Sequence, residues 1–424
     1  MCNAPGVNSD PLAHIPPPAE KRLALRVTPA AQRALRQGHP WVFDGAITAQ
    51  SAEGQPGDLA VIFDDRRRFL AIGLYDPTSP IRVRVLQHGA PQVIDGGWLR
   101  ERLAAASALR VTLPSTGTTG YRLVHGENDG LGGLVIDRYA DTLVVKLYTP
   151  AWIPRLSDLR AALQEIQAGA RVVLRLSRHV QQAVPTGAAV PCCGLANGTV
   201  LSGTPLTLPV LFSENGLYFE ADVLFGQKTG FFLDQRDNRA RVGDLARGKR
   251  TLDVFACSGG FSLYAARGGA PEVLSVDASA GALAAAERHF TLNRHVPAIA
   301  TARHAVQVAD AFAALAALQR RGQRFELVIV DPPAFAKRAS EVDRALRAYT
   351  RLTALALGVL APGGTLVMAS CSSRVSAIDF FAAVHRAAVQ AGRPLVESAR
   401  TGHALDHPVR FPEGAYLKCL FATA

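Results

Sequence analysis

The chain has 424 residues, of which 48% are hydrophobic and 19% are charged. This balance excludes a disordered chain, and the length allows two or three domains with cores of their own. Lys and Arg number 46 against 35 Asp and Glu, which gives a formal net charge of +11. Such an excess favours a polyanionic partner, with nucleic acid the first candidate.

The first 20 residues lack the basic and apolar regions of a secretory signal and are rich in proline, so we expect a disordered tail there. No apolar run reaches the roughly 18 residues of a membrane span. We therefore expect a cytoplasmic protein without a membrane partner. The cysteines show no C-x-x-C spacing, which predicts reduced thiols and no metal site. They are Cys2, Cys192, Cys193, Cys257, Cys371 and Cys419.

Residues 21–90 show short alternating segments separated by turn residues, which is typical of a small β-barrel domain. Strands are expected at 23–27, 59–63, 69–75 and 81–86, and one helix at 30–37. In the last strand Arg82 and Arg84 alternate with apolar residues, which predicts one buried face and one cationic face. These two arginines are candidate contacts to phosphates.

Residues 91–209 have an α+β pattern. Helices are expected at 98–109 and 154–166, and strands at 134–138, 143–147 and 172–176. The stretch 184–207 is rich in Pro, Gly and Thr and predicts a loop.

From residue 210 to 424 strands alternate with helices, which predicts an α/β domain with a mostly parallel, Rossmann-like sheet covered on both faces. Strands are expected at 251–255, 272–276, 302–308, 327–330 and 365–370. Helices are expected at 261–267, 280–293, 311–320, 341–359 and 376–391.

A candidate cofactor site follows the first of these strands. Asp253 lies in the strand, Phe255 begins the turn, and Gly259 and Gly260 open the next helix. Glycines there let a ligand approach the main chain closely. The turn lacks the G-x-G-x-x-G spacing of a dinucleotide site, which favours S-adenosylmethionine, because that cofactor has no phosphate.

Two further carboxylates complete this site. Asp277 ends the next strand and can accept the hydroxyls of a ribose, and Asp310 follows the third strand, where an adenine would lie. Asp253 would suit the cofactor's ammonium group. The alternative is an α/β protein in which Gly-Gly is only a tight turn.

A candidate chemical site follows the fourth and fifth strands. Asp331 is followed by two prolines that expose carbonyl groups, and Phe335 can stack on a base. Cys371 follows the fifth strand and is a candidate nucleophile, although a buried structural cysteine is the alternative. A thiolate that adds to carbon 6 of cytosine activates carbon 5 toward methylation, whereas methylation at nitrogen needs no thiol. Asp331 would hydrogen-bond the edge of the cytosine.

Eight short segments of the chain carry a family resemblance. They are Gly38–Phe43, Gly57-Asp58, His125–Leu131, Ile136–Tyr139, Glu214–Gly216, Gly226–Arg236, Asp406–Pro408 and Pro412–Lys418. With these segments the chain resembles, from about residue 22 to the end, the bacterial large-subunit ribosomal RNA 5-methylcytosine methyltransferases with an N-terminal PUA domain.

The resemblance implies a PUA-like RNA-binding domain over residues 21–90, a middle domain over 91–209 and a seven-stranded methyltransferase domain over 210–424. It implies that Asp253, Asp277, Asp310 and Asp331 line the cofactor cleft and that Cys371 is the nucleophile. It also places Gln235 near the cofactor and Arg236 near the substrate. The partner would be large-subunit ribosomal RNA, and a homodimer is possible.

The family pattern leaves two other functions open and shows one departure. A related guanine methyltransferase lineage shares Asp-Pro-Pro but lacks the cysteine, and a noncatalytic RNA-binding assembly factor could keep the same fold. Many cytosine-5 enzymes carry a second cysteine after Asp-Pro-Pro, where this chain has Ala334. The group that removes the carbon-5 proton is therefore not identified.

Overall fold

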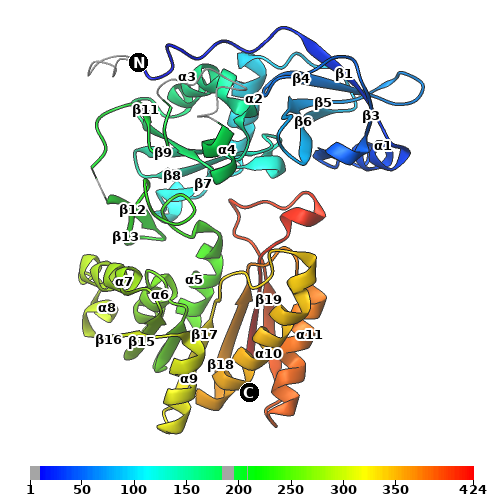
Figure 1. The fold of residues 1–424 in the computed structure, drawn as a ribbon. Helices are drawn as coiled ribbons and strands as arrows, with labels where there is room; N and C mark the ends of the chain where they lie inside the picture. Colours follow the sequence, from blue (N-terminus) through cyan, green and yellow to red (C-terminus); the bar gives the residue numbers. More distant parts are fainter. Residues whose placement is uncertain (1–9, 184–194, 208) are drawn as a thin grey trace. The chain divides into compact units, whose positions relative to one another are not determined.

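The computed structural model describes residues 10–183, 195–207 and 209–424, which form two compact units (Figure 1). The first unit takes the described residues up to Gly216 together with Ala221–Leu233 and Leu405–Phe411. The second takes Leu217–Glu220, Asp234–Ala404 and Pro412–Ala424. Each unit is described by itself below.

A six-stranded sheet forms the N-terminal part of the first unit, in the order β2-β6-β5-β4-β1-β3. In β1 every second side chain is buried, because Leu23, Leu25 and Val27 face the core. Helix α1 begins after Thr28, whose hydroxyl accepts a hydrogen bond from the Ala31 N–H at 3.4 Å. The expected strands and helix of this region are all present. The elements are β1 (Arg22–Val27), α1 (Pro29–Arg36), β2 (Trp41–Phe43), β3 (Ile47–Gln50), β4 (Leu59–Phe63), β5 (Phe69–Tyr75) and β6 (Ile81–His88).

The cationic face expected on β6 is not found. Arg84 is only 7% exposed, and its guanidinium pairs with the carboxylate of Glu127 at 2.8 Å. Arg82 pairs with Asp44 at 2.6 Å. The alternation prediction was wrong for Arg84 because a countercharge distant in sequence offsets the cost of burying its guanidinium.

A five-stranded sheet in the order β11-β10-β9-β8-β7 forms the rest of the first unit. The helix expected from Pro154 begins at Leu156, after a 3-10 turn. The expected loop 184–207 contains strand β11, and its residues 184–194 lie outside the described residues. The elements are α2 (Gly96–Ala108), β7 (Gly120–His125), β8 (Leu134–Tyr139), β9 (Thr142–Leu147), α3 (Leu156–Ile166), β10 (Arg171–Leu176), α4 (Arg178–Ala183) and β11 (Val200–Ser202).

The expected N-terminal tail is only partly described. Residues 1–9 lie outside the described residues. Residues 10–20 differ from the disordered tail expected, because Leu12 is 3% exposed within the core and Asp10 pairs with Arg160 at 2.6 Å.

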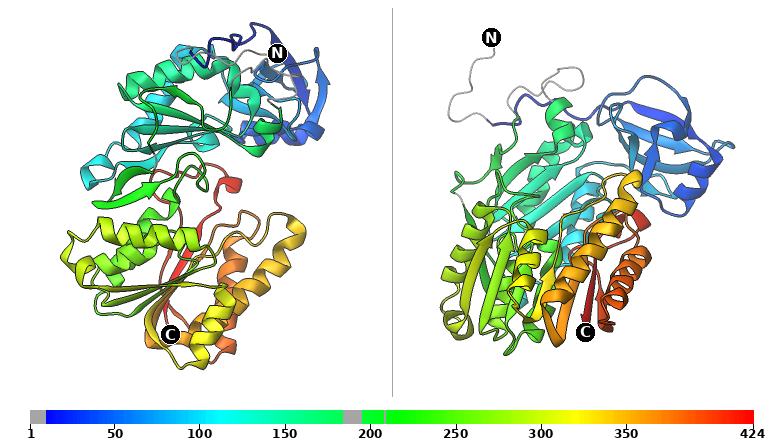
Figure 2. Two further views of the ribbon diagram at one scale, coloured as in Figure 1. Left: turned by 60° about the vertical axis from the view of Figure 1, so that its left-hand side comes forward. Right: turned by 60° about the horizontal axis from the view of Figure 1, so that its bottom comes forward.

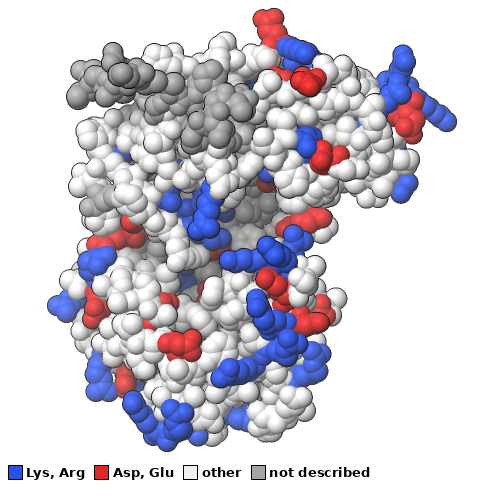
Figure 3. Space-filling view, viewed as in Figure 1, with Lys and Arg blue, Asp and Glu red and all other residues white. Residues whose placement is uncertain are grey.

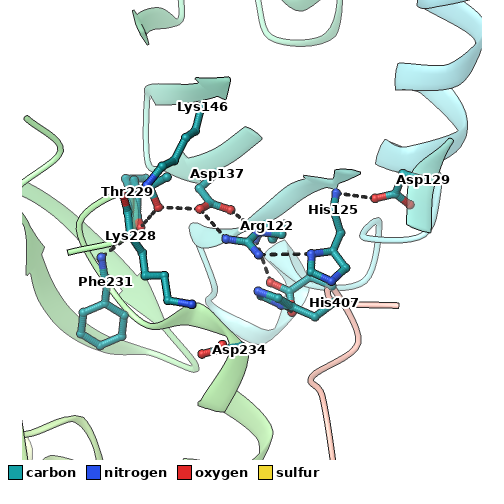
Figure 4. A network of polar contacts seen from close by, with 12 residues as sticks. Arg122, His125, Asp129, Asp137, Lys146, Lys228, Thr229, Phe231, Asp234 and His407 are labelled. Atoms are coloured by element: carbon teal, nitrogen blue, oxygen red, sulfur yellow. Dashed lines mark hydrogen bonds and ion pairs between the residues drawn. The ribbon is translucent and has the colours of Figure 1, made fainter. Parts of the chain in front are cut away.

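A polar network holds Gly226–Leu233, which belong to the first unit, against the strands of that unit (Figure 4). The buried carboxylate of Asp137 accepts from the Arg122 guanidinium at 2.8 Å and from the Thr229 hydroxyl. The Tyr139 hydroxyl lies 2.9 Å from that of Thr229 and accepts from the Phe231 N–H. Two of the segments that carry the resemblance therefore contact each other directly.

The second unit contains a seven-stranded sheet in the order β16-β15-β14-β17-β18-β20-β19. Strands β14 to β18 are parallel, and β20 runs antiparallel to both of its neighbours. Buried apolar side chains of the central strands form the core, as their continuous hydrophobic runs predict. The strands are β14 (Thr251–Val254), β15 (Glu272–Asp277), β16 (Arg303–Val308), β17 (Phe325–Val330), β18 (Leu360–Ser370), β19 (Val396–Thr401) and β20 (Lys418–Thr423).

Helices cover both faces of this sheet (Figures 1 and 2). On one face lie α5 (Arg236–Leu245), α6 (Gly260–Arg267) and α7 (Ala280–Leu292), and on the other α9 (Ala311–Arg320), α10 (Val342–Val359) and α11 (Ala377–Gln390). The remaining elements are the hairpin strands β12 (Val210–Glu214) and β13 (Leu217–Ala221) and the short helix α8 (Pro297–Thr301). Among the described residues, no helix has the length and apolar character needed to cross a membrane.

Candidate active site

The predicted site residues of the second unit gather at one edge of its sheet. Parallel strands end at the same edge, so the residues that follow β15, β17 and β18 are brought close together. Asp277 ends β15, Asp331 follows β17, and Cys371 follows β18.

The turn after β14 has an unusual backbone. Phe255, Cys257 and Gly259 all have positive φ angles, of 65°, 50° and 72°. For Phe and Cys such a conformation costs about 1–3 kcal/mol each, so the surrounding structure must hold it in place. A Cβ atom on Gly259 would lie 2.6 Å from Cβ of Ala286, and one on Gly260 would lie 2.9 Å from Cδ of Arg239. Space therefore excludes a side chain at position 259, whereas one at position 260 would displace the Arg239 side chain.

Asp277 is held by the main chain. Its carboxylate accepts the N–H of Cys257 at 2.9 Å and that of Ser279 at 2.8 Å. A carboxylate has about four acceptor positions, so two remain for hydroxyl groups of a ligand.

His289 supports the same turn from α7. Its Nδ1 donates to the Ser258 carbonyl at 2.8 Å, and its Nε2 accepts the Glu220 N–H at 3.0 Å. This pattern requires the neutral imidazole, and burial lowers the His289 pKa, which favours that form.

Asp253 is fully buried beneath the turn. Its Oδ2 accepts from the N–H and the hydroxyl of Ser262 at 3.0 and 2.7 Å, whereas its Oδ1 has no hydrogen-bond partner among the described residues. Burial raises the Asp253 pKa to about 6, and the nearby Asp277 adds to the shift. A buried carboxylate oxygen without a partner fits a cationic ligand group.

Asp310 has a structural role at the third strand end. It is the N-cap of α9, where its Oδ1 accepts the Ala313 N–H at 3.0 Å, and its side chain is exposed. This contact leaves its second oxygen available to a ligand.

Asp331 lies in a cluster of acidic and polar groups. Burial and the charge of Asp234 raise the Asp331 pKa to about 7, while a hydrogen bond with Gln235 and the charge of Arg239 act in the opposite direction. Asp234 itself accepts the Tyr416 hydroxyl at 2.8 Å. A carboxyl group with this pKa is partly protonated at neutral pH and can donate a hydrogen bond.

Cys371 lies next to the loop that carries Asp331. The Cys371 Sγ donates to the Pro332 carbonyl at 3.8 Å, and the Ser372 hydroxyl donates to the Ala336 carbonyl at 3.1 Å. The two loops are thus joined side by side. Phe335 packs at 5.2 Å from the ring of Tyr349.

Of the other predicted residues, one lies beside Asp331 and three make contacts elsewhere. Gln235 lies beside Asp331, whereas the Arg236 side chain is buried and its Nε contacts Asp237 at 3.1 Å. Arg82 and Arg84 belong to the first unit and are used in the ion pairs described above.

Four site residues were missed from the sequence: Asp234, Arg239, Tyr416 and Lys418. Arg239 stands one helical turn after Arg236 in α5, and Tyr416 and Lys418 lie in a C-terminal segment that shows no helical period. Each lies within or directly beside a segment that carries the resemblance, which was the available signal.

A Rossmann-like sheet of seven strands with one antiparallel strand, a Gly-Gly turn and carboxylates at the strand ends defines an S-adenosylmethionine-dependent methyltransferase. A family model described as S-adenosylmethionine-dependent methyltransferase matches residues 122–414, and a PUA-like domain model matches residues 25–88. The PUA-like match covers the six-stranded sheet of the first unit except for the first three residues of β1.

Curated relatives match nearly the whole chain. A "Ribosomal RNA large subunit methyltransferase" of Deinococcus radiodurans is 48% identical over 96% of this chain and 98% of its own length. A "Ribosomal RNA large subunit methyltransferase I" of Photobacterium profundum is 37% identical, over 91% and 96% respectively.

Two solved structures share the fold. A protein from Streptococcus mutans described as a SAM-dependent methyltransferase matches with a TM-score of 0.79 at 21% identity, over 95% of this chain and all of that one. A methyltransferase solved with S-adenosylhomocysteine matches with a TM-score of 0.80, at the same identity and coverage. The chain belongs to the family of S-adenosylmethionine-dependent ribosomal RNA large subunit methyltransferases with an N-terminal PUA-like domain.

Proposed function

We propose that this protein methylates carbon 5 of a cytosine in large-subunit ribosomal RNA, with Cys371 as the nucleophile. The observation that carries the proposal is the thiol of Cys371 beside the Asp331-Pro332 loop, at the edge of the sheet where the cofactor turn also lies. A nitrogen methyltransferase has no use for a thiol in this position.

The residues of the turn fit the cofactor. In the proposed arrangement Asp277 holds the ribose hydroxyls, the unpartnered Oδ1 of Asp253 meets the ammonium group, and Asp310 lies near the adenine. Phe255, Gly259 and Gly260 shape the turn against which the cofactor rests. Bound S-adenosylmethionine supplies an electrophilic methyl group.

The thiolate of Cys371 forms a bond to carbon 6 of the cytosine, which makes carbon 5 electron-rich. Carbon 5 then takes the methyl group, with S-adenosylhomocysteine as the leaving group. Loss of the carbon-5 proton to water or to another base then expels the thiolate as the carbon–sulfur bond breaks. This covalent route divides one difficult step into two easier ones.

The protonated carboxyl of Asp331 donates a hydrogen bond to N3 of the cytosine ring. Negative charge gathers on this side of the ring when the thiolate adds, so a donor held there stabilises the adduct. Support comes from burial and from Asp234, which together raise the Asp331 pKa to about 7. Gln235 positions the carboxyl through its hydrogen bond, and Phe335 stacks on the base.

Exposed cations near the site favour a polyanionic substrate. Figure 3 shows Lys and Arg side chains gathered over the part of the second unit where α10 lies. The exposed members on this helix and on the loop before it are Lys337, Arg338, Arg344, Arg347 and Arg351. We assign RNA phosphates to these side chains and place the reaction in the cytoplasm. Any contribution from Arg82 and Arg84 would require their ion pairs to open.

The nucleoside product tests the proposal. The purified protein is incubated with large-subunit ribosomal RNA and methyl-labelled cofactor, and the RNA is digested and analysed by mass spectrometry. We expect labelled 5-methylcytidine. Labelled methylguanosine would overturn the cytosine assignment in favour of the guanine alternative, and no labelled nucleoside with any RNA would favour a noncatalytic assembly factor.

A further inference from the structure

A buried lysine lies under the loop that carries Cys371. Lys418 is 4% exposed, and its Nζ donates to the carbonyl oxygens of Ser372 and Val375, the latter at 2.7 Å. Ser372 directly follows the candidate nucleophile. The ammonium therefore holds the main chain directly after Cys371 through these two hydrogen bonds.

The sheet topology explains how this lysine reaches the loop. Lys418 begins β20 and pairs with Ser370, the last residue of β18. Because β20 is antiparallel to β18, the start of β20 lies at the same edge as the end of β18. The antiparallel strand thus brings a cation to the edge where the parallel strands end.

Burial of an ammonium group costs several kcal/mol unless its charge and its donors are satisfied. An ammonium has three N–H donors, and the two carbonyl groups use two of them. Burial lowers the Lys418 pKa to about 8, whereas the negative charge of Cys371 acts to raise it. The ammonium binds the carbonyl group of Ser372, which directly follows Cys371, and so it lies within one residue of the sulfur along the chain.

We propose that Lys418 is a positioning residue that holds the Cys371 loop in place and stabilises the thiolate by its charge. This inference rests on the proposed role of Cys371 as the nucleophile. A lysine that served only to fasten the loop could be replaced by any side chain with suitable N–H donors, whereas stabilisation of a thiolate requires the charge.

Two substitutions separate charge from hydrogen bonding. Lys418→Gln keeps an N–H donor group without the charge, and Lys418→Arg keeps the charge. A matched control is Lys249→Gln, because Lys249 contacts the middle of β18, away from Cys371, through the Thr365 hydroxyl at 3.0 Å. The rate of Cys371 alkylation by iodoacetamide is followed by peptide mass spectrometry from pH 6 to 10, without RNA or cofactor.

We expect Lys418→Gln to raise the pKa of the Cys371 thiol by about one unit, which lowers alkylation at pH 7 about tenfold. In Lys418→Arg and Lys249→Gln, the rate of Cys371 alkylation should stay within about threefold of the rate in the unchanged protein. An unaltered alkylation profile in folded Lys418→Gln would overturn the proposal. If that variant does not fold, the Lys418 pKa is measured by NMR titration in the unchanged protein and in Cys371→Ser. The proposal predicts a lower Lys418 pKa in Cys371→Ser, because the thiolate and the ammonium stabilise each other, and an equal pKa in both proteins would overturn it.

The outcome is independent of the base that is methylated. If Lys418→Gln changes the alkylation of Cys371 but the enzyme forms no 5-methylcytidine, the proposed function is contradicted and the interaction between Lys418 and Cys371 is still supported. A 5-methylcytidine product without coupling would contradict only the role of Lys418.

Discussion

Cys371 and Asp331 are the two residues on which the proposed chemistry depends. Both were predicted from the sequence, because a polar residue that directly follows a buried strand in an α/β domain lies at the ligand edge of the sheet. Of the residues around them, Gln235 was predicted from the resemblance. Asp234 and Lys418 come from distant parts of the chain and are brought to Asp331 and Cys371 only by folding.

At this scale we predict that Cys371→Ala lowers methyl transfer by at least about a thousandfold, because no other group in the proposed mechanism can form the covalent adduct. Binding of S-adenosylhomocysteine, measured by calorimetry, should stay within about threefold. Cys419→Ala, at a buried cysteine on β20, is the control and should keep its activity. Activity of Cys371→Ala close to that of the unchanged protein would exclude the thiol mechanism.

Asp331 provides a prediction about pH and stability. Its folded pKa is raised to about 7, so the stability contributed by the protonated carboxyl is present at low pH and is lost as the pH rises through about 7. Asp331→Asn cannot ionise. We compare the unfolding free energies of Asp331→Asn and the unchanged protein by urea denaturation. As the pH rises from 5.5 to 8.5, we expect the difference between them to change by about 1–4 kcal/mol in favour of Asp331→Asn.

Asp343→Asn, at an exposed position of α10, serves as the control for this measurement. Its difference from the unchanged protein should be independent of pH. If the difference between Asp331→Asn and the unchanged protein were also independent of pH, ionisation of Asp331 would not destabilise the folded protein, which would contradict the prediction.

At the scale of elements, periodicity predicted most of the βα alternation from β14 to α11, because buried parallel strands are continuous apolar runs. It missed the short helix α8 and placed the start of β18 five residues late. It missed β19 and β20. Strand β19 is largely exposed, and β20 follows an irregular segment, so neither presents a clear alternation. It also missed α5, whose sequence Arg236–Leu245 contains many charged residues and little apolar surface.

The cofactor turn gives the prediction at this scale. Alanine at position 259 would place its Cβ 2.6 Å from that of Ala286 at a φ of 72°. We expect Gly259→Ala to lose about 1–3 kcal/mol of unfolding free energy and to bind S-adenosylhomocysteine at least tenfold more weakly.

Gly281→Ala is the matched control, because Gly281 lies in helix α7 and a Cβ there meets nothing within 4 Å. It should leave binding unchanged and slightly raise stability. Equal effects of the two substitutions on binding would contradict the role assigned to the turn.

At the scale of the whole molecule, the net charge of +11 indicated a polyanionic partner but did not locate its surface. The expectation that the arginines of β6 form that surface did not allow for Glu127 and Asp44, which are distant in sequence and pair with them. The cations of α10 could be recognised only once the helix was placed beside the Asp331 loop.

We predict that a combined Arg344→Ala, Arg347→Ala and Arg351→Ala variant binds ribosomal RNA at least tenfold more weakly at about 0.1 M salt and shows a shallower dependence of affinity on salt. Each phosphate that the variant no longer neutralises should reduce the slope of log K against log salt by about 0.7–0.9. The measurement is a fluorescence titration at several salt concentrations.

A control of equal charge change removes Arg320, Arg321 and Arg324, which are exposed at the end of α9. If α10 binds phosphates, this control keeps a steeper salt dependence than the α10 variant. Identical weakening of RNA binding in both variants would show that only net charge matters.

The central claim is a covalent bond between Cys371 and carbon 6 of a cytosine, and a trapped adduct tests it most directly. Ribosomal RNA that contains 5-fluorocytosine is incubated with the protein and S-adenosylmethionine, and the digested complex is analysed by mass spectrometry. Fluorine at carbon 5 cannot leave as a proton does, so the account predicts a stable adduct located on Cys371. An active enzyme that leaves Cys371 unmodified under these conditions would contradict the account.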